Sequence, residues 1–382
     1  MRSWLDLLPA LPWLAPFAVI PRLANQRPNL SDSPSLMDGL VSVIIPARNE
    51  SAVIETVVTS VLASAYQPIE VLVVDDRSID DTAARVSLLT EGDPRLRLVV
   101  GGELPPGWYG KPWACLQGYR AARGDLLLFT DADTRHAPGL LGRAVGALRQ
   151  SEADLLTVAP RQRCETFWER IVMPQIWLLL GVRYHPAWVN RSRRARDVIA
   201  NGQFILMPRA SYEAVGTHES VRGEVAEDLA LAQSVVRQGG RLHFAFAERL
   251  METRMYEGLG PLIEGWSKNV YLGGRRSFPE EPVRRALVPV MLALAFCFWL
   301  TPPVAVLLGA LGGGPAPAAV AATLFAALFW CLICFGMQIP PVYGLGYPLG
   351  AAVALFIAAR STLRGRRRVE WRGRTYAEPD LS

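Results

Sequence analysis

The stretch GDLLLFTDADT, residues 124–134, joins an apolar run to two closely spaced carboxylates. The run from 126 to 130 has the length and composition of a buried β-strand, and Asp131 and Asp133 follow it directly. Because ligands bind beyond the carboxyl ends of the strands in open α/β sheets, we expect both carboxylates to lie at a functional edge. Two hard oxygen ligands at such an edge suit Mg²⁺ or Mn²⁺.

Short β-branched runs alternate with helix-like segments on both sides of this stretch. Strands are predicted at 41–45, 69–74, 96–100, 126–130 and 155–159, and helices near 50–64, 80–90, 111–123 and 138–150. This alternation is typical of βαβ units around a mostly parallel sheet, so the predicted fold class is α/β.

The ends of the first two predicted strands also carry candidate binding residues, which are Pro46, Arg48, Glu50, Asp75 and Asp76. Carboxylates at that edge can accept hydrogen bonds from the imide NH of a uracil and from ribose hydroxyls. Acidic residues at a strand-to-helix turn are also ordinary helix caps, and Asp80 or Asp81 fits that simpler role.

A second acidic site is predicted at the start of a helix near residue 227. Glu227 and Asp228 favour the positive N-terminus of that helix, and helix capping alone would explain them. The functional interpretation makes Asp228 the general base for an acceptor hydroxyl, with Glu227 as its substitute if Asp228 faces away.

The C-terminal third contains most of the apolar sequence. Residues 286–359 include no Asp, Glu, Lys or Arg, and this uncharged stretch is long enough for two or three membrane helices. Spans are predicted at 286–309, 317–338 and 343–359. The uncharged stretch 7–21 has Pro9, Pro12 and Pro16 inside it and is expected to be a membrane anchor or an interfacial segment. Residues 171–182 are expected to form an interfacial helix or a core helix, followed by a mobile Arg-rich loop.

The net charge of +5 arises from arginines that flank these apolar segments, at 191–196, 284–285 and 364–368. This placement favours cytoplasmic anchoring and anionic lipid headgroups over a nucleic-acid footprint. Two basic clusters on the same side require an even number of crossings between them, so one of the three runs, near 339–350, is expected to be re-entrant or interfacial. The five cysteines form no disulfide framework and the four histidines show no ligand spacing.

Four ordered motifs resemble glycosyltransferase family 2, which has the GT-A fold, and more narrowly its membrane-bound hopene-associated and ceramide-glucosyltransferase-like members. They are VSVIIPARNE at 41–50, VLVVDDRSIDDT at 71–82, GKPWACLQGYRAARGDLLLFTDADT at 110–134 and AEDLALA at 226–232. The resemblance implies transfer of a sugar from a nucleotide-sugar that is held with a divalent metal.

The resemblance also assigns roles to individual residues. It implies that Pro46, Glu50, Asp75 and Asp76 surround the nucleoside, that Lys111 lies near the donor diphosphate, that Asp131 and Asp133 hold the metal, and that Asp228 is the base.

The chain departs from the family downstream, where a Q/R-x-x-R-W signature has Gly265 in place of the arginine before Trp266. Lys268 or Arg254 could supply the missing charge, and Trp266 could be a packing residue.

The predicted organisation is an N-terminal membrane segment at 1–27, a linker at 28–39, a GT-A domain at 40–275, transmembrane helices at 284–360 and a basic cytoplasmic tail at 361–382. The predicted function is inverting transfer from a UDP-sugar to a lipid acceptor, in hopanoid or related lipid biosynthesis, by a multi-pass protein of a bacterial inner membrane with a cytoplasmic catalytic domain. The alternatives are a polyprenyl-phosphate or polysaccharide glycosyltransferase, and a non-catalytic nucleotide-binding membrane scaffold. The charge-free spans argue against a transporter.

Overall fold

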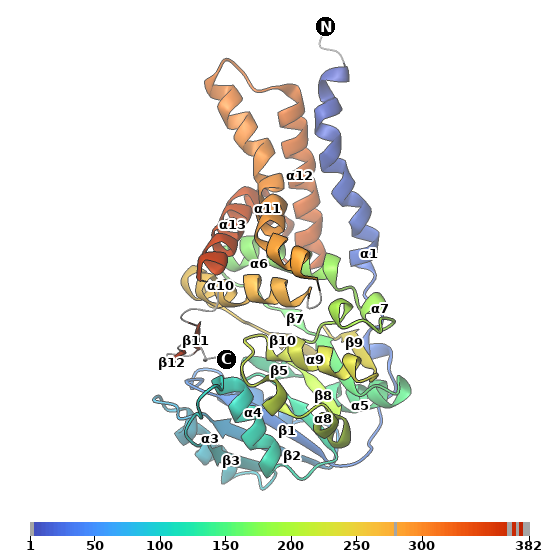
Figure 1. Ribbon diagram of the computed structural model, residues 1–382, viewed down its shortest axis with the longest axis vertical. Coiled ribbons are helices and arrows are strands. Elements are labelled where there is room, and N and C mark those ends of the chain that lie inside the picture. The colour runs from blue at the N-terminus through green and yellow to red at the C-terminus, as the bar shows by residue number, and fades with distance from the viewer. Residues whose placement is uncertain (1–3, 279–280, 365–368, 372–373, 377–382) are drawn as a thin grey trace.

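The computed structural model describes residues 4–278, 281–364, 369–371 and 374–376. An α/β domain occupies one half of the molecule, and long helices rise from one side of it (Figure 1). The main sheet has seven strands: β1 (Val41–Ala47), β2 (Ile69–Asp75), β3 (Leu96–Val100), β4 (Leu126–Phe129), β6 (Leu155–Ala159), β8 (Ile205–Pro208) and β9 (Leu242–Phe246).

The strand order of this sheet is β3-β2-β1-β4-β8-β6-β9. β1 pairs in parallel with β2 and β4, β2 with β3, and β6 with β9, which confirms the predicted mostly parallel α/β sheet. Only β8 runs antiparallel to its two neighbours in this sheet. This strand was not predicted, and it brings the loop that precedes it to the carboxyl end of β4.

Helices cover both faces of the sheet. One face packs against α2 (Ile54–Leu62), α3 (Thr82–Thr90) and α5 (Leu140–Gln150), and the other against α4 (Gly110–Ala121), α8 (Arg209–Ala214) and α9 (Glu227–Arg237). Along β1, Val43 and Ile45 belong to the first core and Ile44 to the second, as the two-residue period of a strand requires. Gly118 lets α4 approach closely, because a Cβ there would lie 2.4 Å from Ile44 Cγ2.

Shorter elements complete the domain. A second sheet joins β5 (Thr134–His136), β10 (Met251–Thr253) and β7 (Arg161–Gln162), and a hairpin joins β11 (Val369–Trp371) and β12 (Arg374–Tyr376). The short helices are η2 (Leu30–Asp32), α7 (Pro186–Val189), η3 (Ala195–Asp197) and η4 (His218–Val221). The 28–39 segment lies along α5, where the Arg143 guanidinium donates to the carbonyls of Ser31 and Ser33 at 2.6 and 2.7 Å.

The remaining helices are η1 (Trp4–Val19), α1 (Ile20–Ala24), α6 (Phe167–Arg183), α10 (Leu259–Arg276), α11 (Pro282–Leu311), α12 (Pro317–Gly336), η5 (Pro341–Gly346) and α13 (Tyr347–Arg364). Among the described residues, four segments are long and apolar enough to cross a membrane: Leu5–Ala24, Pro282–Leu311, Pro317–Gly336 and Pro341–Arg364. The predicted basic run from Arg364 to Arg368 lies, after Arg364, outside the described residues.

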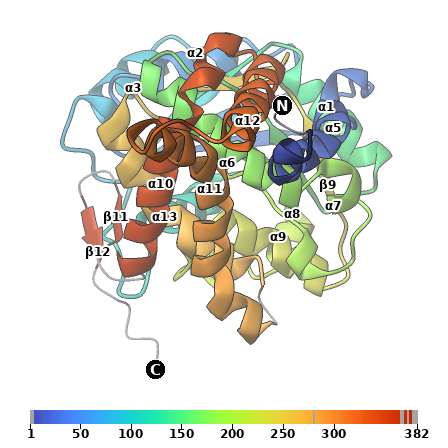
Figure 2. The ribbon, with the colours of Figure 1, turned by 90° about the horizontal axis from the view of Figure 1, so that it is seen from above.

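These four segments are not arranged alike. α11 and α12 form an antiparallel pair, and the N-terminal helix stands beside α12 (Figures 1 and 2). The ring of Trp13 stacks on Phe298 with centroids 5.0 Å apart. In contrast, α13 lies at the base of the pair, next to α6 and α10 (Figure 1). Glu264 of α10 binds Arg360 at 2.8 Å and Arg364 at 2.5 Å, which fastens α13 to α10.

Candidate active site

The Asp131-Ala132-Asp133 turn follows β4 at the centre of the sheet edge. The amide of Thr130 donates to the carbonyl of Ile44 at 3.1 Å, and the Thr134 hydroxyl donates to the carbonyl of Asp131 at 2.8 Å. The turn is therefore tied to β1 on one side and closed by its own hydroxyl on the other. Both carboxylates line the same large cavity.

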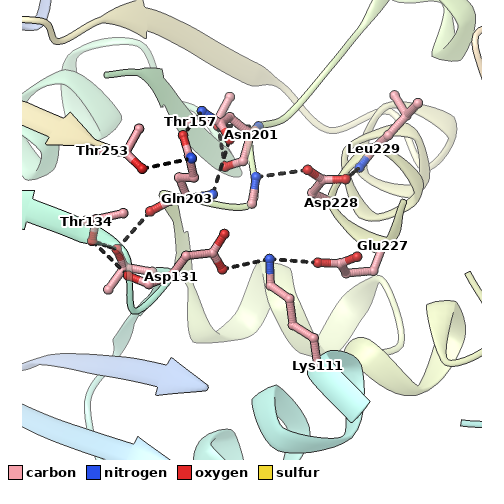
Figure 3. Close-up of polar contacts among 12 residues, drawn as sticks. Lys111, Asp131, Thr134, Thr157, Asn201, Gln203, Glu227, Asp228, Leu229 and Thr253 are labelled. Atoms are coloured by element: carbon pink, nitrogen blue, oxygen red, sulfur yellow. Dashed lines mark hydrogen bonds and ion pairs between the residues drawn. The ribbon is translucent and has the colours of Figure 1, made fainter. Parts of the chain in front are cut away.

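Lys111 connects this turn to the start of α9. Its ammonium nitrogen lies 2.7 Å from Asp131 Oδ1 and 2.9 Å from Glu227 Oε1 (Figure 3). Burial acts to lower the pKa of Lys111, but Asp131, Glu227 and Asp228 outweigh it and raise the pKa well above its usual value. Lys111 is therefore a fixed positive charge among three carboxylates.

The first turn of α9 brings two of those carboxylates to the cavity. Burial raises the pKa of Glu227 to about 7, against the lowering effect of Lys111. The Asp228 carboxylate accepts the amide of Gly202 at 2.9 Å and the amide of Leu229 at 2.7 Å. Burial raises the pKa of Asp228 as well, although Lys111 and the two amides oppose this change.

Residues 201–203, which sequence reasoning missed, link the two acidic sites (Figure 3). The Gly202 amide holds Asp228, and the Gln203 carbonyl accepts the Thr130 hydroxyl at 2.8 Å, next to the Asp131 turn. The amide of Asn201 donates to Thr157 Oγ1 at 2.9 Å, and its side-chain amide donates to Gln203 Oε1 at 3.0 Å. These bonds fix the separation between the Asp131 turn and Asp228.

His136 lies buried beneath the same turn. Its Nε2 is 3.1 Å from Thr130 Oγ1 and 3.2 Å from Thr134 Oγ1. Burial lowers the pKa of His136 to about 4, so the ring is neutral at pH 7 and hydrogen-bonds to the two hydroxyls. The sequence assigned it no role, because the pairing of β5 with β10 that buries it is a long-range contact.

The predicted nucleoside-binding residues gather at the ends of β1 and β2. Pro46 and Glu50 line the cavity. Asp75 pairs in register with Ala47, and its two carboxylate oxygens lie 3.4 and 3.3 Å from the amide of Ser78. Asp76 is fully buried.

Arg48 and Asp80 shape the turns around that group. The Arg48 guanidinium donates to the carbonyls of Asp76 and Arg77 at 2.6 and 2.8 Å, so it joins the ends of β1 and β2. Asp80 accepts the amide of Thr82 at 3.0 Å in the turn that precedes α3, whereas Asp81 is the N-cap residue of α3 and makes no capping hydrogen bond through its side chain. Hydrogen bonds from Thr82 and Ser51 outweigh burial and lower the pKa of Asp80 to about 2.

Tyr256 explains why the chain has a glycine where the family signature has an arginine. A Cβ at Gly265 would lie 2.2 Å from Tyr256 Cε1, so the tyrosine ring occupies the space of any side chain there. Trp266 is buried and donates its indole NH to Met173 Sδ at 3.3 Å, as a packing residue would. Trp266 and Lys268 both line the cavity. Arg254 instead pairs with Glu165 and Glu169, at 2.8 and 3.3 Å.

The cavity has a volume of about 1420 Å³ and runs from the sheet edge to the apolar helices. Its polar end is lined by Pro46, Glu50, Lys111, Asp131, Asp133, Glu227 and Asp228, and its apolar end includes Leu292 and Phe296 of α11 and Ile333 of α12. Drug-sized ligands occupy pockets of roughly 300–1,000 Å³, so this cavity has room for two substrates.

The carboxylates of Asp131 and Asp133 suit a hard divalent cation such as Mg²⁺ or Mn²⁺. In the part of the chain that the structure describes, no three His, Cys, Asp or Glu side chains gather as a ligand set. A cation held here would therefore take further oxygen ligands from a bound phosphate or from water, which is usual for Mg²⁺.

Comparisons with known proteins agree with this geometry. Residues 42–211 match the model of the family described as glycosyl transferase family 2. The 4,4'-diaponeurosporenoate glycosyltransferase of Staphylococcus aureus strain MRSA252 is 29% identical over 277 residues, which are 70% of this chain and 68% of that protein.

A solved structure shares the fold. The mannosyltransferase PcManGT from Pyrobaculum calidifontis, solved with GDP-Man and Mn²⁺, superposes with a TM-score of 0.59 at 21% identity and covers 94% of this chain and 99% of its own. Together with the match over residues 42–211 and the strand-edge carboxylates, these similarities identify the chain as a glycosyltransferase that carries a family 2 domain of the GT-A fold.

Proposed function

We propose that this glycosyltransferase transfers a sugar from a nucleotide-sugar to a lipid acceptor at the membrane surface. The observation that carries the proposal is the continuous cavity that joins the carboxylates at the sheet edge to α11 and α12. A water-soluble donor fits the polar end and an apolar acceptor fits the other end. A UDP-sugar donor and a hopanoid or related acceptor remain the specific predictions from the sequence.

In this proposal Pro46, Glu50, Asp75 and Asp76 surround the nucleoside and Lys111 faces the diphosphate. Asp131 and Asp133 would hold a divalent cation, which would stabilise the charge that develops on the leaving nucleoside diphosphate. The Asp228 carboxylate removes the proton of the acceptor hydroxyl. One base facing one leaving group predicts inversion at the anomeric carbon.

The proposal also includes the orientation of the membrane helices. We propose that the N-terminal helix, α11 and α12 cross the bilayer and that α13 lies at its cytoplasmic surface beside α6 and α10. Two crossings then separate Arg284 from Arg364, so both basic clusters and the catalytic domain lie in the cytoplasm, as positive-inside anchoring requires.

The first experiment supplies membranes containing the protein with a panel of labelled nucleotide-sugars, followed by extraction and identification of the labelled lipid. Apolar alcohols, polyprenyl phosphates and a carotenoid carboxylic acid are offered as acceptors, the last because of the name of the Staphylococcus relative. A labelled lipid that depends on Mg²⁺ or Mn²⁺ supports the proposal. Consumption of the nucleotide-sugar in the presence of every acceptor class, without formation of a labelled lipid, would contradict the proposal.

Asp228→Asn tests the proposed base. With an alcohol acceptor, kcat should fall by about 10²–10⁴-fold, because the amide cannot accept the proton. Donor affinity, measured by calorimetry, should stay within a few-fold. A carboxylic acid acceptor is already ionised at pH 7 and should lose much less activity. Unchanged turnover of an alcohol would reject Asp228 as the base.

A further inference from the structure

A second groove lies outside the catalytic cavity, between the N-terminal helix, α6, α7, α11 and α12. Its volume is about 630 Å³. Leu178 of α6, Trp299 of α11 and Phe329 of α12 line its apolar part, and Arg183, Ser192 and Asp197 line its polar part. The groove is therefore amphipathic along its length.

The groove also lies where candidate spans meet the catalytic domain. Arg22 is near the end of the span Leu5–Ala24, and its guanidinium carbon lies 3.4 Å from the ring centre of Trp188, which lines the groove. The side chain of Trp188 remains exposed. Tryptophan and arginine together at the end of an apolar helix are typical of the headgroup level of a bilayer.

Exposed arginines flank Ser192, which lines the polar part of the groove. Arg191, Arg193 and Arg194 are exposed on the loop after α7. Among the described residues, neither these three arginines nor Arg22 forms an ion pair with an acidic side chain. The carboxylate in the groove, Asp197, lies 3.6 Å from Arg183 and 3.8 Å from Arg196, so its charge is already balanced. The loop that contributes Ser192 to the groove, together with Arg22, therefore carries an excess of positive charge next to the apolar part.

We propose that this groove binds an anionic phospholipid of the surrounding bilayer. One acyl chain lies against Leu178, Trp299 and Phe329, and the phosphate lies near Arg22 and the arginines of the α7 loop. Charge complementarity selects this occupant over a neutral lipid, because several cations near a membrane surface attract anionic headgroups. The donor and acceptor of the catalytic reaction use the other cavity, so this site is a separate one.

The bound lipid would also help to hold the N-terminal helix against α6 and α7. Two hydrogen bonds join the end of that helix to α6 and to the start of α7: Arg22 donates to the Val182 carbonyl at 3.0 Å, and His185 Nε2 lies 2.9 Å from the Arg22 carbonyl. Both contacts lie beside the groove. α6 residues 178, 179 and 183 line both the groove and the catalytic cavity, so the lipid packs on their shared wall.

The test measures binding of acyl-labelled phosphatidylglycerol and phosphatidylcholine to the full-length protein in neutral detergent. The wild type should bind phosphatidylglycerol at least tenfold more tightly. The triple variant Arg191→Gln/Arg193→Gln/Arg194→Gln should lose this preference. A matched triple variant on the far side of the catalytic domain, Arg85→Gln/Arg120→Gln/Arg241→Gln, removes the same charge and should keep it.

A second variant tests the apolar part of the groove. Val19→Trp places a large ring in the groove and should weaken binding of both lipids, with the melting temperature and the donor affinity unchanged. Equal binding of the two lipids by the wild type would overturn the proposal. A preference that survives in the α7-loop triple variant to the same extent as in the matched control would also overturn it.

Discussion

At the scale of single residues, Lys111 sets the charge of the active site. It is the cation that contacts both the Asp131 turn and the start of α9. Without its ammonium group, repulsion among neighbouring carboxylates would no longer be offset by Lys111, and the pKa values of Glu227 and Asp228 would rise further.

Lys111→Gln should therefore shift the acid limb of the pH–rate profile to higher pH. The base must be deprotonated to act, and loss of the ammonium raises the pKa of Asp228 and Glu227. The measurement is kcat against pH from 5 to 9, with Lys111→Arg as the charge-conserving control. An unshifted acid limb, with only KM increased, would limit Lys111 to donor binding.

His136 makes the folded state sensitive to acid. Its folded-state pKa of about 4 lies below its ordinary value of 6.5, so the unfolded chain binds a proton that the folded protein does not. Stability is full above pH 6.5 and is lost as the pH falls towards 4, by at most about 3 kcal/mol.

His136→Gln keeps a hydrogen-bonding side chain and removes this titration. The decrease in melting temperature between pH 7.5 and pH 5 should be smaller in the variant than in the wild type. His218, whose pKa burial lowers to about 3, remains in both proteins and contributes the same acid sensitivity to each. Equal decreases in the two proteins would show that His136 is not the sensitive group.

At the scale of elements, the loop before β8 holds the side chain of Asp228, the proposed base, in position. Gly202 is closely surrounded, because a Cβ there would lie 2.7 Å from Lys111 Nζ and 3.3 Å from Asp228 Oδ2. The atoms in the way are the ends of flexible side chains, so the backbone can keep its place while the polar contacts change.

Gly202→Ala should therefore lower kcat by about tenfold or more with a melting temperature close to that of the wild type, since small misplacements of catalytic groups are costly. The matched control is Gly139→Ala, where an added Cβ meets nothing within 4 Å. Loss of folding in the Gly202 variant alone would mean that the loop supports the core and not only the site.

The sequence allowed β1 to β4 and β6 to be predicted because each is a compact apolar run followed by polar residues. It also placed Asp131, Asp133, Glu227 and Asp228, which directly follow a strand or begin a helix. It did not reveal β8 or the role of Gly202, because pairing with β4 and β6 is a long-range contact without a local pattern. The sequence also does not show that the ring of Tyr256 occupies the space that a side chain at position 265 would need, where the family signature has an arginine.

At the scale of the whole molecule, the arrangement of helices predicts which loops face each side of the membrane. A cysteine introduced as Ala316→Cys, in the exposed turn between α11 and α12, should react with an impermeant maleimide added to intact spheroplasts. Ser87→Cys, exposed on α3, should react only after permeabilisation. The unmodified chain measures the background from the five native cysteines. The opposite pattern would reverse the proposed orientation.

The long cavity also determines in which units the concentration of each substrate has to be expressed. One of its ends faces the carboxylates and the other faces the apolar helices, so in the proposed reaction the donor arrives from water and the lipid acceptor arrives by diffusion within the membrane. The effective acceptor concentration is then a mole fraction within the membrane, which changes when inert lipid is added and not when the buffer volume changes. The rate of such an enzyme follows the composition of the bilayer in which it resides.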